Sequence, residues 1–82
     1  MQLSLQTDYS LRSLMFLATH AGRRNVAEIA LFFHISEGHV AKVINHLSRL
    51  GYVRSIRGVG GGVELARAPD QITIGEIVAA VE

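Results

Sequence analysis

SEGHVAKVINHLSRLG, residues 36–51, has the clearest helix signals in this sequence. Ser36 is a favoured helix N-cap, and Gly51 is typical of the position just after a helix C-terminus. A helix is therefore predicted over about residues 37–50. At about 100° per residue, its apolar side chains gather on one side, which must face a core. These side chains are Val40, Val43, Ile44, Leu47 and Leu50.

A β-hairpin, or wing, is predicted directly after this helix, over about residues 52–66. Two segments of high β-propensity, residues 52–57 and 63–65, flank a tip in which four of five residues are glycine, residues 58–62. A simple flexible turn would explain one or two of these glycines but not four. We therefore expect a tip without side chains that can approach another molecule closely.

Glycine-rich loops also bind nucleotides, which is an alternative function for residues 58–62. A Walker loop ends in Gly-Lys-Ser/Thr, whereas Val63 and Glu64 follow the glycines here. A dinucleotide fingerprint needs a helix directly after the glycines, but this segment has strand character and runs into Pro69. Both nucleotide interpretations fail on their sequence context.

Thr7 is the expected N-cap of a first helix over about residues 8–20, which would end at Gly22. This helix has two apolar sides. Tyr9 and Phe16 lie on one of them. The other is a stripe expected to face the core and consists of Leu11, Leu14, Met15 and Ala18. Either both sides are buried in one core, or the side with Tyr9 and Phe16 meets a partner subunit or a further helix.

Asn25 and Glu28 have the spacing of a capping box and predict a short second helix near residues 26–33. His34 and Ile35 would form the turn into the helix over 37–50. Two helices joined by so short a link are the outline of a helix-turn-helix.

Thr73 and Glu76 form a second capping box, which starts a C-terminal helix at about residue 74. No capping signal closes this helix, so we expect the chain to be the N-terminal part of a longer protein. Residues 1–82 are expected to form one domain, mainly α with a small β-hairpin, which is a winged helix-turn-helix.

Positive charge is concentrated in the predicted helix and hairpin. Residues 38–63 hold four of the eight Lys and Arg residues and none of the seven acidic residues. A helix and a loop that share a cationic face are the electrostatic footprint of a protein that binds a phosphate backbone. Any single charged residue on a helix can be an ordinary solvent-exposed side chain, so the prediction of DNA binding depends on the whole set of cations.

Lys42 and Asn45 are expected to face bases in the major groove, because Lys donates to guanine and Asn pairs with adenine. Gly38 would let the backbone approach, and Arg57 with the glycine tip would enter the minor groove. His39 lies near the edge of the core side, where a structural histidine is the better interpretation. The full set of expected DNA-binding residues is Ser36, Gly38, His39, Lys42, Asn45, Arg49, Arg54, Arg57, Gly58, Gly60 and Gly61.

Composition argues against several other classes of protein. The longest apolar runs have five residues, whereas a membrane helix needs about 20. The N-terminus lacks the features of an export signal, so a cytoplasmic location is expected. With no Cys and four His without ligand spacing, neither a disulfide nor a metal site is expected. No constellation of catalytic residues is present, so we do not expect an enzyme.

Motifs along the whole chain carry a family resemblance. They include Thr7-Asp8-Tyr9, Gly51-Tyr52-Val53 and ITIGEI over residues 72–77, and the most specific is RGVGGGVELA over residues 57–66. Together they resemble the IscR/NsrR-type (Rrf-type) family of bacterial winged helix-turn-helix regulators. The residues that look most like the nitric-oxide-sensing repressor branch, NsrR, are His39, Lys42, Ile44, Asn45 and Leu47.

The resemblance implies a homodimeric transcriptional regulator, usually a repressor, bound to a palindromic operator in double-stranded DNA. Its third helix would enter the major groove and its wing the minor groove. Family members hold an iron–sulfur cluster on Cys residues further along the chain and dimerise through a long C-terminal helix. This sequence has neither feature, so no cofactor is expected in it.

Some family members take a cluster ligand other than Cys from near the N-terminus, for which Asp8 would be the candidate. Asp8 in a first helical turn is better explained as a partner of the helix dipole. A winged helix used only for protein–protein assembly is the alternative function, because a fold does not fix a function.

Overall fold

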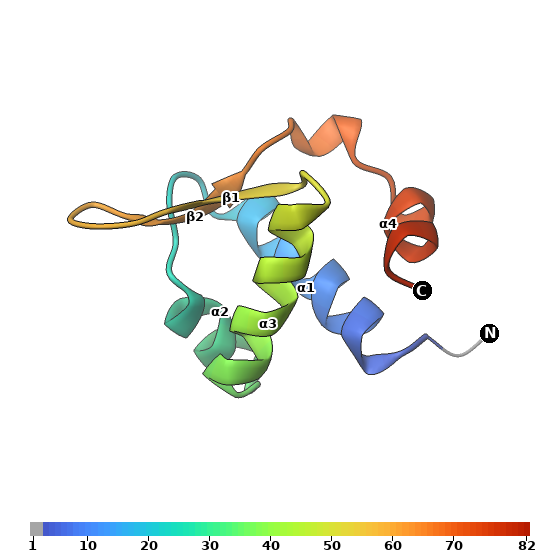
Figure 1. Ribbon diagram of the computed structural model, residues 1–82, viewed down its shortest axis with the longest axis horizontal. Coiled ribbons are helices and arrows are strands. Elements are labelled where there is room, and N and C mark those ends of the chain that lie inside the picture. The colour runs from blue at the N-terminus through green and yellow to red at the C-terminus, as the bar shows by residue number, and fades with distance from the viewer. Residues whose placement is uncertain (1–2) are drawn as a thin grey trace.

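A computed structural model describes residues 3–82 of the chain. The hairpin projects from a body of helices, with its tip well beyond them (Figure 1). The elements in chain order are α1 (Leu5–Thr19), α2 (Val26–Phe33), α3 (Glu37–Arg49), β1 (Val53–Ile56), β2 (Gly62–Leu65), the short 3-10 helix η1 (Pro69–Gln71) and α4 (Ile74–Val81). This is a winged helix-turn-helix, so the predicted fold class is confirmed.

The helix-turn-helix is formed by α2 and α3. The capping box of α2 is confirmed, because Asn25 Oδ1 accepts from Glu28 N at 2.8 Å and Glu28 Oε1 accepts from Asn25 N at 3.2 Å. His34 ends α2 in the left-handed conformation, with φ of 58°. Ser36 then caps α3 by accepting from His39 N at 3.2 Å, as predicted.

The first helix begins almost one turn earlier than predicted. Its N-cap is Ser4, whose Oγ accepts a hydrogen bond from Thr7 N at 3.1 Å, so the assignment of Thr7 was wrong. Ser and Thr have the same capping chemistry, and the earlier of the two hydroxyl residues takes the cap here. Thr7 is buried instead, and its hydroxyl donates to the carboxylate of Glu82 beyond α4.

A single apolar core lies between the helices and the hairpin. It consists of Leu14, Phe16, Leu17, Ile29, Ala30, Val40, Val43, Ile44, Leu47, Tyr52, Val53, Val63 and Ile77. The predicted core side of the helix α3 is confirmed, since only its C-cap Leu50 is not fully buried. One core of this size is what a domain of about 80 residues is expected to bury.

The face that α1 buries overlaps the predicted stripe only in part, because Leu14 is buried as predicted and Leu11 packs partly buried against the core. Met15 is 64% exposed, whereas Ser10 and Ser13 are buried. The helix α1 packs against α3 and α4, and the buried Ser10 hydroxyl donates to Gln6 O at 2.7 Å. A search for apolar residues at helical spacing cannot identify Ser10 and Ser13 as buried, because both residues are polar.

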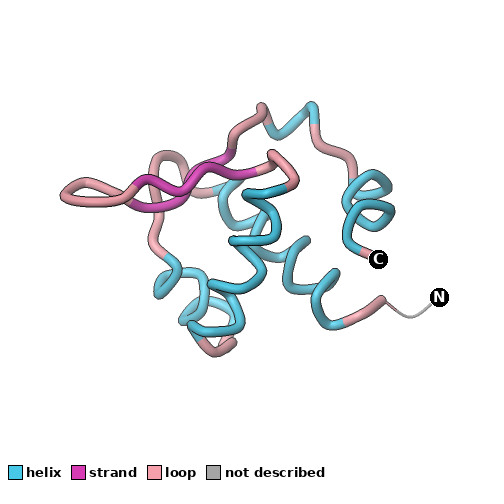
Figure 2. Tube along the Cα trace, in the orientation of Figure 1, coloured by secondary structure: helices cyan, strands magenta, loops and turns pink. Residues whose placement is uncertain are grey.

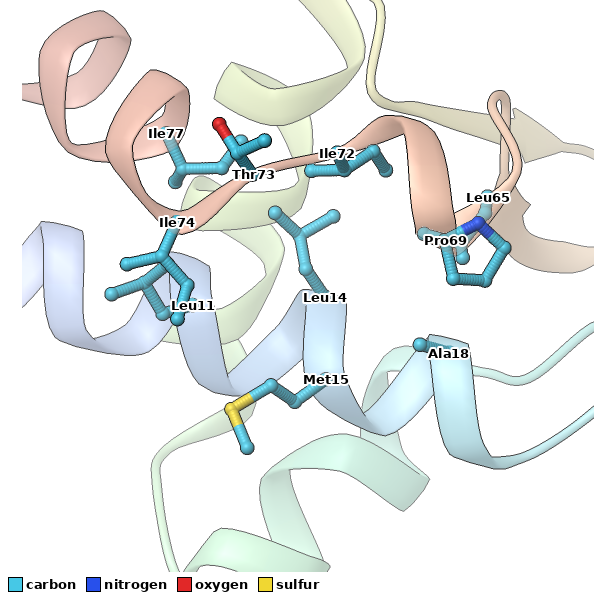
Figure 3. A pocket seen from close by; sticks show the side chains of 10 residues that line it. All are labelled: Leu11, Leu14, Met15, Ala18, Leu65, Pro69, Ile72, Thr73, Ile74 and Ile77. Carbon is cyan, nitrogen blue, oxygen red and sulfur yellow. The ribbon is translucent and has the colours of Figure 1, made fainter.

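Met15 lines an open apolar pocket of about 140 Å³ with Leu11, Ala18 and Ile74 (Figure 3). The pocket lies between α1 and the segment that contains η1 and the start of α4. Burial of both apolar sides of α1 in this chain's own core is therefore wrong, because the side with Met15 stays open. The alternative placed a partner subunit or a further helix on the side with Tyr9 and Phe16, and it was wrong as well, because Phe16 is buried in the core and Tyr9 packs against it.

The wing is a two-stranded antiparallel hairpin (Figure 2). Its register pairs Val53 with Leu65 at the base and Ile56 with Gly62 at the tip. A short bridge joins it to the link before α2, because Arg24 N donates to Val63 O at 2.9 Å and Val63 N donates back at 2.6 Å. The strand β2 is thus held from both sides near Val63.

The final helix, α4, starts at a capping box in which Glu76 N donates to Thr73 Oγ1 at 3.1 Å and Thr73 N donates to Glu76 Oε1 at 2.8 Å. The predicted capping box is confirmed. Ile77 anchors the helix in the core. Across residues 3–82, none of the helices combines the length and the apolar character that crossing a membrane requires.

Candidate nucleic-acid interface

The outer face of α3 carries Gly38, Lys42, Asn45 and Arg49, and all four are exposed. At about 100° per residue they fall within about 60° of one another, opposite the buried apolar side. Lys42 and Arg49 take part in none of the ion pairs formed within residues 3–82. This face therefore offers unneutralised hydrogen-bond donors, which is the chemistry that phosphates and base edges require.

The residues that flank this face have partners inside the molecule. His39 is half-buried, and its ring stands edge-on against Tyr9 with centroids 4.7 Å apart. His46 Nδ1 is hydrogen-bonded to Gln6 Nε2 at 2.8 Å. Ser36 is exposed and serves as the cap of α3. The contact with Tyr9 is consistent with the structural histidine that was expected, and contact of Ser36 or His39 with DNA stays a prediction.

The glycines of the wing tip are required by the backbone itself. Gly58, Gly60 and Gly62 have φ of 94°, 76° and 146°, a region that other residues rarely adopt. A Cβ on Gly61 would stand 2.3 Å from the carbonyl oxygen of Ile56. The interpretation that a turn here would need only one or two glycines was therefore wrong. Their number follows from the conformation of the tip before any ligand is considered.

Arg57 and Val59 are the side chains that the tip presents to solvent. Arg57 is exposed and takes part in none of the ion pairs within residues 3–82. Val59, which the sequence did not single out, is fully exposed between two glycines. An apolar residue inside a glycine tip carries no sequence signal that separates it from ordinary turn residues.

Arg54 differs from the other cations because it is paired. It faces Glu64 across the hairpin, and its Nη2 lies 3.1 Å from Glu64 Oε2. Arg23, from the link between α1 and α2, donates from Nε to Glu64 Oε1 at 2.9 Å. The acid-free block of sequence ends one residue before Glu64, so only the strand register shows that Glu64 balances Arg54.

The two arginines also set the ionisation of Glu64. The hydrogen bond from Arg23 lowers the pKa of Glu64 below its usual 4.5, partial desolvation opposes this, and the charges of Arg23 and Arg54 add to the lowering. Arg23 was not among the predicted site residues. Its partner is 41 positions away along the chain, and no local pattern signals so distant a contact.

The residues present do not fit an iron–sulfur cluster. The chain has no Cys, so it supplies no thiolate, which is the ligand such clusters require. Asp8 lies in the first turn of α1, as predicted, and its Oδ1 accepts from Arg12 Nε at 2.9 Å. Within residues 3–82, the His, Asp and Glu side chains form no group of three or more that could hold a metal ion.

Comparison with known proteins agrees with this architecture. The family model Rrf2, described as an iron-dependent transcriptional regulator, matches residues 3–82. The HTH-type transcriptional regulator NsrR of Bacillus licheniformis is 49% identical over 80 residues, which cover 95% of this chain and 56% of that protein. NsrR of Bacillus subtilis is 48% identical over 84 residues, covering all of this chain and 58% of that protein. The chain therefore spans somewhat more than half the length of these relatives.

Solved structures show the same fold. CymR (YrzC), the global cysteine regulator of B. subtilis, matches with a TM-score of 0.92 and 33% identity, over all of this chain and 65% of that one. T. potens IscR matches with a TM-score of 0.91 and 32% identity, over all of this chain and 61% of that one. The resemblance to IscR/NsrR-type regulators is confirmed, and the chain belongs to the Rrf2 family of transcriptional regulators.

Proposed function

We propose that this chain is the sequence-specific DNA-binding part of a repressor that recognises a palindromic operator as a homodimer in the bacterial cytoplasm. The observation that carries the proposal is the outer face of α3. It is exposed and free of acidic residues, and α3 leads into a projecting hairpin in which the exposed Arg57 directly precedes the glycine tip. The helix enters the major groove, and the wing lies along the adjacent minor groove.

Lys42 and Asn45 read base edges in this arrangement, the first by donating to guanine and the second by pairing with adenine. Gly38 supports a close approach of the backbone, because a Cβ there would meet nothing within 4 Å and its φ is ordinary. The fold itself therefore does not require glycine at this position. The absence of a side chain at Gly38 would instead let DNA approach the backbone of the first turn of α3 closely.

The remaining contacts are with phosphates and the minor groove. Arg49 contacts phosphate from the last turn of α3, and Arg57 enters the minor groove, where arginine favours narrow, electronegative tracts. Val59 adds an apolar contact of the kind that minor-groove proteins place against bases. Arg54 contributes to phosphate binding only as far as its pair with Glu64 allows.

The test is selection of duplexes from a random DNA pool, followed by anisotropy titrations with a selected duplex and with a random one. Binding is expected to weaken with salt, with log K falling against log salt at a slope of about −3 per module. Lys42→Ala is expected to weaken binding to the selected duplex by about tenfold and to reduce the preference over the random one.

Arg12→Gln is the matched control, because Arg12 is an exposed cation on α1 outside the proposed interface, and it should leave both affinities unchanged within about twofold. An equal loss on both duplexes with Lys42→Ala would reassign Lys42 to phosphate contact. Selection that enriches no sequence, or binding that is indifferent to salt, would contradict the proposal and favour a protein–protein module.

A further inference from the structure

Arg23 lies outside both elements of the proposed interface, yet its guanidinium contacts the hairpin twice. Its Nε donates to Glu64 Oε1 at 2.9 Å, and its Nη1 donates to the backbone carbonyl of Gly60 at 3.0 Å. Glu64 belongs to β2 and Gly60 to the wing tip. One side chain therefore spans strand and tip, a task that suits the rigid fork of arginine.

The tip needs support from outside the hairpin. The strands β1 and β2 have four residues each, and a lone two-stranded hairpin is marginally stable in water. Glycine loses more conformational freedom on ordering than any other residue, and four of the five tip residues are glycines. Without an external contact, such a tip would sample many positions relative to the helix α3.

Two neighbouring residues of the link between α1 and α2 contact the hairpin: Arg24 through its backbone and Arg23 through its side chain. The backbone bridge between Arg24 and Val63 holds β2 near its start. The bond from Gly61 N to Gly58 O at 2.9 Å is internal to the tip. Among the hydrogen bonds formed within residues 3–82, only the one from Arg23 to Gly60 ties the tip to a part of the molecule outside the hairpin.

We propose that Arg23 is a positioning residue for DNA recognition, which holds the wing tip at a fixed place relative to α3 so that Arg57 meets the minor groove. This inference rests on the proposed function. Positioning by Arg23 would favour binding, because a tip that is already ordered loses less conformational entropy when DNA binds. Arg23 shares the carboxylate of Glu64 with Arg54, which leaves one positive charge among the three groups, so the test must separate the charge of Arg23 from its hold on the tip.

A double-mutant cycle with the selected duplex tests this role. Arg23→Gln alone and Arg57→Ala alone are each expected to weaken binding by about tenfold. If Arg23 acts through the tip, the double variant will be no more than about twofold weaker than Arg57→Ala alone. Losses that multiply in the double variant would mean that Arg23 acts independently of the wing and would overturn the proposal.

Arg23→Lys separates positioning from direct phosphate contact. Lysine keeps the charge but cannot hold both the Glu64 carboxylate and the Gly60 carbonyl with a fixed fork, so it should lose nearly as much affinity as Arg23→Gln. Full rescue by lysine would overturn the proposal. Arg12→Gln is again the matched control, with a side chain 48% exposed against 46% for Arg23 and a similar pairing with one carboxylate.

Backbone 15N relaxation of the chain without DNA provides a readout that is independent of affinity. Arg23→Gln should lower the order parameters of Gly60 and Gly61 while those of α3 stay unchanged, and unchanged values at the tip would overturn the proposal. Circular dichroism confirms that each variant folds. A wild-type chain that binds no duplex would overturn the proposed function itself, whereas wild-type affinity and wild-type tip order in Arg23→Gln would overturn only the role of Arg23.

Discussion

Glycine serves two different purposes in this chain, and the purpose can be determined for each residue. At Gly61 the backbone leaves no room for a side chain, with a Cβ position 2.3 Å from Ile56 O. At Gly38, in the first turn of α3, the surrounding space is open and the backbone is ordinary. The first glycine is required by the fold, whereas the second is available for function.

Replacing each of these glycines with alanine should therefore have opposite effects on stability. Gly61→Ala is expected to destabilise the fold by about 1–3 kcal/mol, because carbonyl oxygens must move to admit the methyl group. Gly38→Ala should stabilise it by up to about 1 kcal/mol through helix propensity. Gly38→Ala should nevertheless weaken binding to the selected duplex. Urea unfolding and anisotropy titrations measure the two effects, and unchanged DNA affinity in Gly38→Ala would exclude a close backbone approach there.

Glu64 gives stability a pH dependence of predictable sign. Its pKa is lowered in the folded chain by the hydrogen bond and charge of Arg23 and by the charge of Arg54. A carboxylate with a depressed folded pKa stabilises the fold above its unfolded pKa, and this contribution disappears as pH falls through the lower folded value. The loss should therefore occur below the usual value of 4.5.

Glu64→Gln tests this expectation. The difference in unfolding free energy between wild type and variant should be constant near neutral pH and should shrink below about pH 4.5. Urea unfolding at several pH values measures it. The variant also releases two arginines, so binding to a random duplex should tighten at low salt. A stability difference that does not vary with pH would show that Glu64 is not held ionised by these partners.

At the scale of elements, the N-terminus of α3 combines a structural role with a proposed functional one. Ser36 caps the helix through His39 N and is exposed where the helix would meet DNA. The same side chain is thus available both to the backbone of α3 and to a phosphate. Substitutions that preserve one of these roles and remove the other can separate them.

Ser36→Ala is expected to cost about 1 kcal/mol of stability, because an N-cap acceptor is lost. Ser36→Asp restores the cap and adds a favourable interaction with the helix dipole, so its stability should match that of wild type. Its negative charge should nevertheless weaken DNA binding by about tenfold or more through repulsion of phosphate. Thermal unfolding and anisotropy titrations measure the two effects, and an Asp variant that binds DNA like wild type would place Ser36 away from the backbone.

At the scale of the whole molecule, α1 joins the recognition elements to α4. It contacts both α3 and α4, and its exposed Met15 lines the pocket that Ile74 of α4 also lines (Figure 3). Adjacent residues of one helix thus have very different surroundings. Leu14 is 6% exposed, whereas Met15 is 64% exposed.

Truncation of these neighbours should separate core from surface. Leu14→Ala is expected to destabilise the fold by about 2–5 kcal/mol, because it leaves a cavity among packed side chains. Met15→Ala should cost less than about 1 kcal/mol, since little of its side chain is buried. Urea unfolding at pH 7 checks both values. Equal losses would mean that the open side of α1 is covered in solution.

The order of elements could be predicted from sequence because its signals are local. Capping boxes at Asn25 and Thr73, the Ser36 cap and the period of the helix α3 each act within a few residues. The first helix shows the limit of this reasoning. Either of two hydroxyl residues could cap it, and burial of small polar residues removed the apolar signal that usually marks a core face.

The winged helix-turn-helix and the exposed face of α3 can be deduced from the residues alone, because periodicity and capping follow from neighbours along one chain segment. Which charges stay free depends on how the segments pack against one another. Arg54 is paired because strand register places Glu64 opposite it, and Arg23 reaches Gly60 because folding brings the link before α2 beside the wing. Such contacts depend on distances between segments far apart in sequence, which no local pattern records.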